Sequence, residues 1–230
     1  MSVQFAPAPS HLSAIAATPL AKPSDYSPSR QVGLRAAGPV QEYSPDDQIF
    51  GQGEDADIFF RVVTGVVRTC KFMSDGRRQV QAFHVAGELI GFEQGDEYTL
   101  TAEAVCDCTL VPYRRSGLDA QLASNEVLTR QLFAHAMRSL KQAREHSLLL
   151  GRRSAVEKVA AFLIEWAEHS PDGQMANLAM TRQDIADYLG LTIETVSRTL
   201  SQLERDAVIE LPALRQIRLK DPAALRTLNA

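Results

Sequence analysis

Glu194, Ser197 and Arg198 are polar residues spaced to share one face of a short helix, within the segment LTIETVSRTLSQLE (191–204). Apolar Val196 and Leu200 follow the same helical period on the opposite face. A guanidinium can donate to O6 and N7 of guanine, a carboxylate can accept from the cytosine amino group, and a small hydroxyl can meet a base edge. This pattern predicts a helix that reads bases in the DNA major groove.

The alternative for this face is an ordinary solvated surface. Glu194 and Arg198 would then form an i,i+4 ion pair worth about 0.2–0.5 kcal/mol. Both interpretations can hold together, since such a pair would orient Arg198 before DNA arrives. We favour base reading because the residue types agree with the geometry of known recognition helices.

Two capped helices must position this face. TRQDIADYLG (181–190) predicts a helix with Thr181 as N-cap, Asp184 near its positive end and Gly190 as its terminator. Thr192 precedes the next helix as a second N-cap. The strand-like runs VIEL and IRLK follow, so the segment predicts a winged helix-turn-helix.

Polar residues near the two helix N-termini are expected to bind DNA phosphates, which fixes the register of the protein without reading sequence. These residues are Thr181, Arg182, Gln183, Thr192 and Thr195.

Residues 118–150 contain neither glycine nor proline and predict one continuous helix, about 50 Å long. Apolar residues recur along it at steps of three and four, close to a heptad rhythm, with Asn125 as a polar residue that could set the register. We interpret this seam as a dimer interface; the alternative is a helix that packs only on its own domain. The interface residues would be Leu122, Leu128, Leu132, Ala136, Leu140 and Ala143.

The segment before this helix is rich in strand-forming residues. FFRVVTGVVRTCKF (59–72) is β-branched and aromatic, glycines recur at Gly53, Gly65, Gly76 and Gly87, and Asp75-Gly76 is a hairpin signal. Short strands with regular turns predict a double-sheet β-roll. We therefore expect four parts: a disordered tail (1–35), a β-roll (36–116), a dimerisation helix (117–150) and a winged helix-turn-helix domain (151–230).

Composition and net charge limit where the protein can act and what it can bind. No apolar run in the 230 residues approaches the roughly 18 needed for a membrane helix, and no signal peptide is evident, so we expect a cytoplasmic protein without membrane contact. The formal net charge of −4 argues only weakly against DNA binding, because the local field decides.

Over residues 40 to about 225 the chain resembles the CRP/FNR superfamily of bacterial transcription regulators, most strongly in TRQDIADYLGLTIETVSRTLSQLERDAVIEL. ETVSR is the form seen in the FNR and FixK branch, whereas the cAMP receptor branch usually has ETVGR. The resemblance implies an α+β fold with a cyclic-nucleotide-binding-like β-roll, a long dimer helix and a winged helix-turn-helix. It further implies a homodimeric activator, not an enzyme, that contacts RNA polymerase and binds an inverted repeat such as TTGA-N6-TCAA. A FixK-like role would connect it with nitrogen fixation and oxygen limitation.

The sequence departs from the cyclic-nucleotide-binding relatives at their phosphate site. Gly87-Glu88 matches the family's Gly-Asp turn, but Phe92 stands where Glu is expected and Tyr98-Thr99 where an Arg-Ser pair would bind phosphate. A buried phosphate without an arginine would be poorly compensated. We therefore expect no cyclic nucleotide and, on the FixK resemblance, no bound effector or cofactor.

Two sensor alternatives remain open on the same scaffold, responding to oxygen limitation or nitric oxide. Redox control would use Cys70, Cys106 or Cys108, although none lies at the N-terminal position of the FNR iron–sulfur ligands and none has metal-binding spacing. A haem sensor would use His84, His135 or His146. An enzyme of cupin type is disfavoured, because the β-roll holds only one histidine, His84, and cupin metal sites need several.

Overall fold

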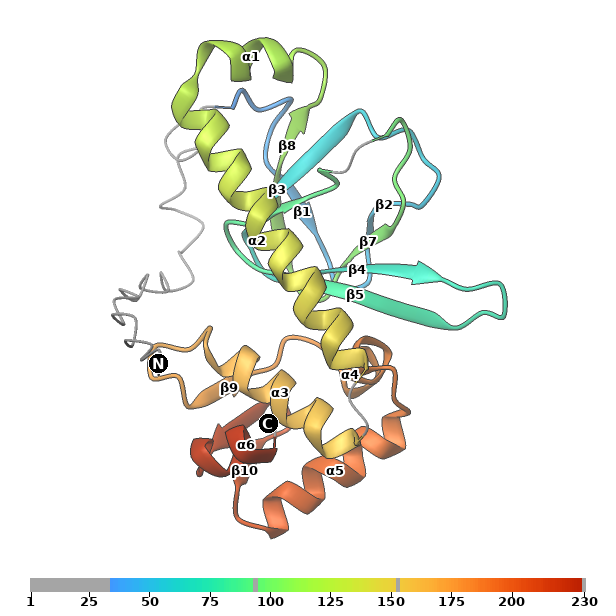
Figure 1. Ribbon diagram of the computed structural model, residues 1–230. Coiled ribbons are helices and arrows are strands. Elements are labelled where there is room, and N and C mark those ends of the chain that lie inside the picture. Colours follow the sequence, from blue (N-terminus) through green and yellow to red (C-terminus); the bar gives the residue numbers. More distant parts are fainter. Residues whose placement is uncertain (1–33, 93–94, 152–153, 229–230) are drawn as a thin grey trace, which may run out of the picture.

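The computed structural model describes residues 34–92, 95–151 and 154–228. A β-roll lies at one end, a helical unit with a small sheet lies at the other, and a long helix runs beside the roll toward that unit (Figure 1). The predicted tail lies outside the described residues except for Leu34 and Arg35. Leu34 is buried in the roll's core, and Ala36 forms an antiparallel bridge with Tyr113.

The β-roll consists of two four-stranded sheets, with strand orders β1-β8-β3-β6 and β2-β7-β4-β5. All of the pairings are antiparallel, and the side chains of Phe50, Phe60, Val62 and Leu110 are buried between the sheets. The predicted double-sheet architecture is therefore confirmed. The strands are β1 (Gln41–Tyr43), β2 (Gln48–Phe50), β3 (Ile58–Thr64), β4 (Val67–Phe72), β5 (Arg78–His84), β6 (Leu89–Ile90), β7 (Thr101–Ala104) and β8 (Cys108–Arg114).

The hairpin expected at Asp75-Gly76 joins β4 to β5. Gly76 has a φ of 81°, in the left-handed region that glycine enters without a steric penalty. Strands β4 and β5 pair from Val67–His84 to Phe72–Arg78. Arg78 and Gln79, close to the turn of this hairpin, contact the helix-turn-helix.

The long helix predicted over 118–150 is interrupted, so that prediction was wrong. Helix α1 (Leu118–Ser124) ends before Asn125, whose backbone is extended, and α2 (Glu126–Leu150) begins after it. The side chain of Asn125 accepts a hydrogen bond from Leu128 N at 3.0 Å. Asparagine is a strong N-cap and competes with a continuing helix. Asn125 therefore starts α2 and does not act as a polar register residue within one helix.

Helix α2 packs against its own β-roll along its first turns, which corrects part of the predicted dimer seam. Leu128 and Leu132 are only 1% and 5% exposed, and they share a core cluster with Phe59 and Tyr113. Leu122 is partly buried against the same cluster. The alternative interpretation, a helix packed on its own domain, therefore holds for this end of the seam. Ala136, Leu140 and Ala143 remain exposed.

The C-terminal unit combines four helices with a three-stranded sheet of order β10-β11-β9. The two predicted wing strands pair antiparallel, and β9 adds a third strand that the sequence pattern did not reveal. Its elements are α3 (Ala155–Ala167), β9 (Met175–Asn177), α4 (Arg182–Leu189), α5 (Ile193–Arg205), β10 (Ile209–Ala213), β11 (Gln216–Leu219) and α6 (Pro222–Leu228).

None of the helices in the described ranges is long and apolar enough to cross a membrane.

Candidate nucleic-acid interface

Helix α4 begins with the predicted capping box. Thr181 Oγ1 accepts from Asp184 N at 3.1 Å, and Asp184 Oδ2 accepts from Thr181 N at 2.9 Å and from Thr181 Oγ1 at 2.7 Å. The amide and hydroxyl of Thr181 are thus both used inside the helix. In this structure Thr181 is a capping residue, which leaves neither group to donate to a phosphate.

The turn between α4 and α5 has the predicted geometry. Gly190 adopts φ 62° and ψ 44°, and Thr192 Oγ1 accepts from Thr195 N at 3.2 Å, which caps α5. On the inner face of α5, Val196, Leu200 and Leu203 are at most 2% exposed. They belong to one core cluster with residues of α3 and α4. The two helices therefore form one packed unit that fixes where the outer face of α5 points.

The outer face of α5 carries the three predicted base-reading residues. Glu194 and Arg198 are exposed, and Ser197 is half-buried. Within the described ranges the side chain of Arg198 has no hydrogen bond and no ion pair within 4 Å, so the alternative i,i+4 pair with Glu194 is not formed. The pKa of Glu194 is lowered first by hydrogen bonds from its own backbone and from Thr192, with Arg198 contributing last. The guanidinium therefore remains available to an external acceptor.

The remaining predicted phosphate ligands lie around this face. Arg182 Nη1 donates to Ser197 Oγ at 3.3 Å, which joins the start of α4 to the middle of α5. Gln183 is exposed and bonds Asp187 Oδ1 at 2.7 Å. The Oγ1 atoms of Thr192 and Thr195 lie 3.0 Å apart. A cationic group at Arg182 and hydroxyl groups at Thr192 and Thr195 thus lie near the predicted base-reading residues, an arrangement compatible with a helix that enters a groove between two phosphate strands.

The interior of the β-roll shows what replaces the phosphate site. Tyr98 is 5% exposed, its hydroxyl donates to Ile58 O, and its ring stacks on Phe50 with centroids 3.9 Å apart. Phe92 packs edge-on against Phe59. Aromatic rings therefore pack where the resemblance places an Arg-Ser pair in the nucleotide-binding relatives. The nearby guanidinium of Arg115 donates to the backbone carbonyls of Gly91 and Gly95.

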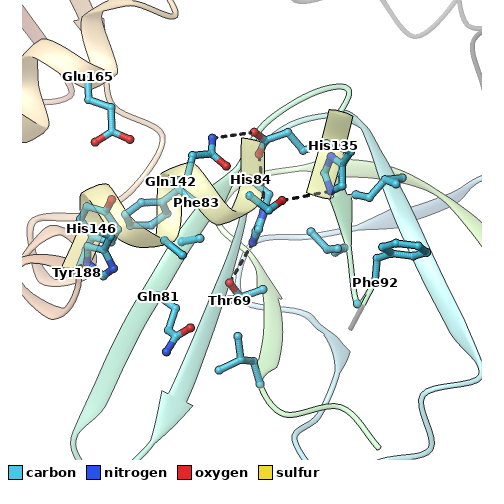
Figure 2. Close-up of a pocket in the computed structure, with 18 of the residues that line it drawn as sticks. Thr69, Gln81, Phe83, His84, Phe92, His135, Gln142, His146, Glu165 and Tyr188 are labelled. Carbon is cyan, nitrogen blue, oxygen red and sulfur yellow. Dashed lines mark hydrogen bonds and ion pairs between the residues drawn. The ribbon is translucent and has the colours of Figure 1, made fainter. Parts of the chain in front are cut away.

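A cavity of about 430 Å³ lies between β5, α2, α3 and α4, and the three histidines considered as haem ligands all line it (Figure 2). His84 bonds Thr69 Oγ1 through Nε2 at 3.0 Å and faces Glu88 through Nδ1 at 3.6 Å. His146 Nε2 bonds Tyr188 O at 2.8 Å, and its ring stacks on Tyr188.

His135 Nε2 lies 3.4 Å from Ser139 Oγ. Burial lowers the pKa of both His135 and His146, so both rings are neutral near pH 7. His146 joins α2 to α4, His84 bonds within the roll and His135 bonds within α2. These contacts favour a structural role for the three histidines.

The three cysteines differ in their chemistry. Burial raises the pKa of Cys70 to about 11, and the pKa of buried Cys108 is raised mainly by its hydrogen bond with Cys106. That same hydrogen bond lowers the pKa of half-buried Cys106 to about 6. Cys106 borders a second cavity, of about 610 Å³, between the roll and the C-terminal unit. Of the three, only Cys106 combines access with thiolate character, which reactivity requires.

Comparison with known proteins agrees with this arrangement. Residues 157–228 match the Crp-like helix-turn-helix domain, and residues 40–125 match the cyclic nucleotide-binding domain. The nitrogen fixation regulation protein FixK of Azorhizobium caulinodans is 45% identical over 202 residues, which cover 86% of this chain and 82% of that protein. FixK of Rhizobium meliloti is 40% identical over 210 residues, covering 90% and 96%. The solved structure of FixK2 from Bradyrhizobium japonicum aligns with a TM-score of 0.80 and 42% identity, covering 86% and 98%.

A helix-turn-helix with an uncovered polar face, joined to a β-roll, defines a DNA-binding transcription regulator. The chain belongs to the CRP/FNR family and is a regulator of the FixK/FNR type.

Proposed function

We propose that this regulator is a homodimeric activator that binds an inverted repeat of the TTGA-N6-TCAA type without a bound effector and recruits RNA polymerase. The observation that carries the proposal is the outer face of α5, where Glu194 and Arg198 are exposed around half-buried Ser197. Arg198 would read guanine through O6 and N7, and Glu194 would accept from the cytosine amino group. The names of the FixK relatives point to nitrogen-fixation genes as targets.

An exposed apolar stripe on α2 supports dimerisation. Phe133, Met137 and Leu140 are 66%, 45% and 42% exposed, and their spacing of four and three residues places them on one face. Ala136 and Ala143 are exposed on the same helix and would let two backbones approach closely. Pairing two copies along this stripe would remove its apolar surface from water and stabilise the dimer. A two-fold axis would then present two recognition helices to successive major grooves.

Two features support the absence of an effector. Tyr98, stacked on Phe50, stands where the nucleotide-binding relatives have an Arg-Ser pair, and His84 and His146 of the neighbouring cavity each make a hydrogen bond within the protein. In this proposal the regulator is controlled through its abundance, and it acts in the cytoplasm, where the bacterial chromosome lies.

The test is binding of the purified protein, without additives, to a TTGA-N6-TCAA duplex and to a scrambled duplex over a range of salt concentrations. The proposal predicts tight binding to the inverted repeat and weak, strongly salt-dependent binding to the scrambled duplex. Weak and unselective binding to both, corrected by added haem or by a change of redox state, would overturn the effector-free part.

Redox control through Cys106 is the second candidate, and the favouring observation is its lowered pKa of about 6 beside the cavity between the two domains. Attack of its thiolate on hydrogen peroxide would break the O–O bond, yield a sulfenic acid and release hydroxide. Peroxide should then change operator affinity in the native protein and leave a Cys106→Ser variant unchanged.

A further inference from the structure

The β4–β5 hairpin is bonded to the first helix of the helix-turn-helix. Arg78 Nη2 lies 2.6 Å from Asp184 Oδ1, and Arg78 Nε lies 2.9 Å from Asp187 Oδ2. From the neighbouring strand, Arg68 Nη1 reaches the same Asp184 oxygen at 3.1 Å. Residues more than a hundred positions apart thus form one ion-pair network across the domain boundary.

Carboxylates of the β-roll also contact both guanidiniums. Glu103 Oε2 on β7 lies 2.7 Å from Arg68 Nε and 3.5 Å from Arg78 Nη1, and Asp46 Oδ1 lies 2.8 Å from Arg68 Nη2. The side chains of Arg68 and Asp184 are 8% and 3% exposed. The network therefore sets two cations among four carboxylates, of which Asp46 is exposed and the other three are largely buried. Removal of either cation would leave like charges facing each other.

The far end of α4 is held as well. The last carbonyls of a helix have no partner inside it, and here neighbouring elements supply the donors. Gln79 Nε2, on the same hairpin, donates to Asp187 O at 2.6 Å. His146 of α2 bonds Tyr188 O, and Lys158 of α3 donates to Leu189 O at 3.1 Å. Both ends of α4 are therefore fixed against the rest of the protein.

This docking leaves the DNA-reading surface uncovered. The network uses Asp184 and Asp187 of α4, whereas Glu194 and Arg198 on the outer face of α5 stay exposed. Since α5 packs on α4 through buried Val196, fixing α4 also fixes the direction in which α5 points. The contact with the roll is thus compatible with DNA binding.

We propose that Arg68 and Arg78 are positioning residues for operator binding: they hold the helix-turn-helix in one orientation on the β-roll, so that no effector is needed to order it. This inference rests on the proposed function. A dimer that binds two half-sites needs its two recognition helices at a fixed separation. Each helix-turn-helix that is already oriented loses less freedom on binding, so the second half-site adds more affinity.

The test compares Arg78→Gln with Arg77→Gln as the matched control. Arg77 is adjacent on the hairpin, and its side chain is 82% exposed and is bonded only to Asp75 within the described residues. Each protein is titrated with the full inverted repeat and with a duplex that keeps one half-site. We expect Arg78→Gln to raise the Kd for the full repeat about tenfold, a usual size for coupling between sites, while its half-site Kd stays unchanged. Arg77→Gln should match the native protein on both duplexes.

The half-site measurement separates positioning from folding. A variant that merely fails to fold would lose affinity for both duplexes alike, and Arg78→Lys, which keeps the charge without the fork, should fall between the native protein and Arg78→Gln. Equal full-repeat binding by Arg78→Gln and the native protein would overturn the inference alone. Tighter binding of the full repeat by Arg78→Gln would also overturn it, because the network would then hold the helix-turn-helix in an orientation that opposes operator binding. Failure of the native protein to prefer the full repeat would instead overturn the proposed function, and the effector-free role of the network with it.

Discussion

The two oxygens of Asp184 serve different partners, with Oδ1 lying 2.6 Å from Arg78 Nη2 of the roll and Oδ2 closing the capping box with Thr181. One carboxylate therefore both starts the first DNA-binding helix and joins it to the other domain. A change at Asp184 removes both interactions, whereas a change at Arg78 removes only the second, so the two positions separate helix capping from domain docking.

Acid should lower the free energy of unfolding, because it protonates Asp184. Burial acts to raise its pKa, but hydrogen bonds from Thr181 and the charges of Arg68 and Arg78 together hold the pKa below its ordinary value. Because the folded pKa lies below that of the unfolded chain, the stabilisation is present above about pH 4 and is lost as the pH falls through the folded value. Urea unfolding between pH 7 and pH 3 should therefore show that the free energy of unfolding falls less with acid in Asp184→Asn than in the native protein. Identical pH profiles would contradict this assignment.

Arg198→Ala should abolish site selectivity. The expected loss is about 1–3 kcal/mol of discrimination against the wrong base, while weak, salt-sensitive binding through phosphate contacts persists. Competition between the inverted repeat and a duplex substituted at the guanine measures this directly. Arg205→Ala is the control, because Arg205 lies at the other end of α5 and bonds Gln202 Oε1 at 2.9 Å. A mutant at Arg198 that still prefers the repeat would exclude Arg198 as the base-reading residue.

Two leucines of α2 should behave differently when each is shortened to alanine. Leu128 is 1% exposed inside the roll's core, so Leu128→Ala should lower the free energy of unfolding by about 2–5 kcal/mol. Leu140 is 42% exposed, so Leu140→Ala should leave the fold intact and weaken the dimer. Urea denaturation and sedimentation equilibrium measure the two effects. If Leu128→Ala weakened the dimer and left the free energy of unfolding unchanged, Leu128 would belong to the dimer interface that the sequence predicted.

Alkylation should be selective among the cysteines. The hydrogen bond with Cys108 lowers the pKa of Cys106 and favours its thiolate, whereas burial raises the pKa of Cys70 to about 11 and keeps that thiol protonated. Brief treatment with iodoacetamide followed by peptide mass spectrometry should label Cys106 first, and Cys106→Ser should remove that early label. Equal labelling rates at Cys70 and Cys106 would show that the two thiols do not differ in reactivity.

The features that could be predicted from the sequence rest on local rules. The caps at Thr181 and Thr192, the left-handed Gly190 and the polar face of α5 each depend on a few neighbouring residues, and the structure confirms their geometry. The roll architecture followed from strand-forming runs and regularly spaced turns.

The break at Asn125 was missed because helical periodicity continues across it, although an N-cap residue followed by Glu126 was a usable signal. The contacts of Arg68 and Arg78 with Asp184 could not be predicted, since they join residues 116 and 106 positions apart through the packing of two domains. The assignment of Leu128 to the core depended on the same long-range packing.

The most direct test of the central claim is the stoichiometry and affinity of the cofactor-free protein on the TTGA-N6-TCAA duplex, compared with the same duplex in which one half-site is scrambled. We predict two protomers on each intact duplex, and a loss of most of the affinity when one half-site is scrambled, because two recognition helices read the repeat together. Equal affinity for both duplexes, or one protomer on the intact repeat, would contradict a two-fold dimer that reads its operator without an effector.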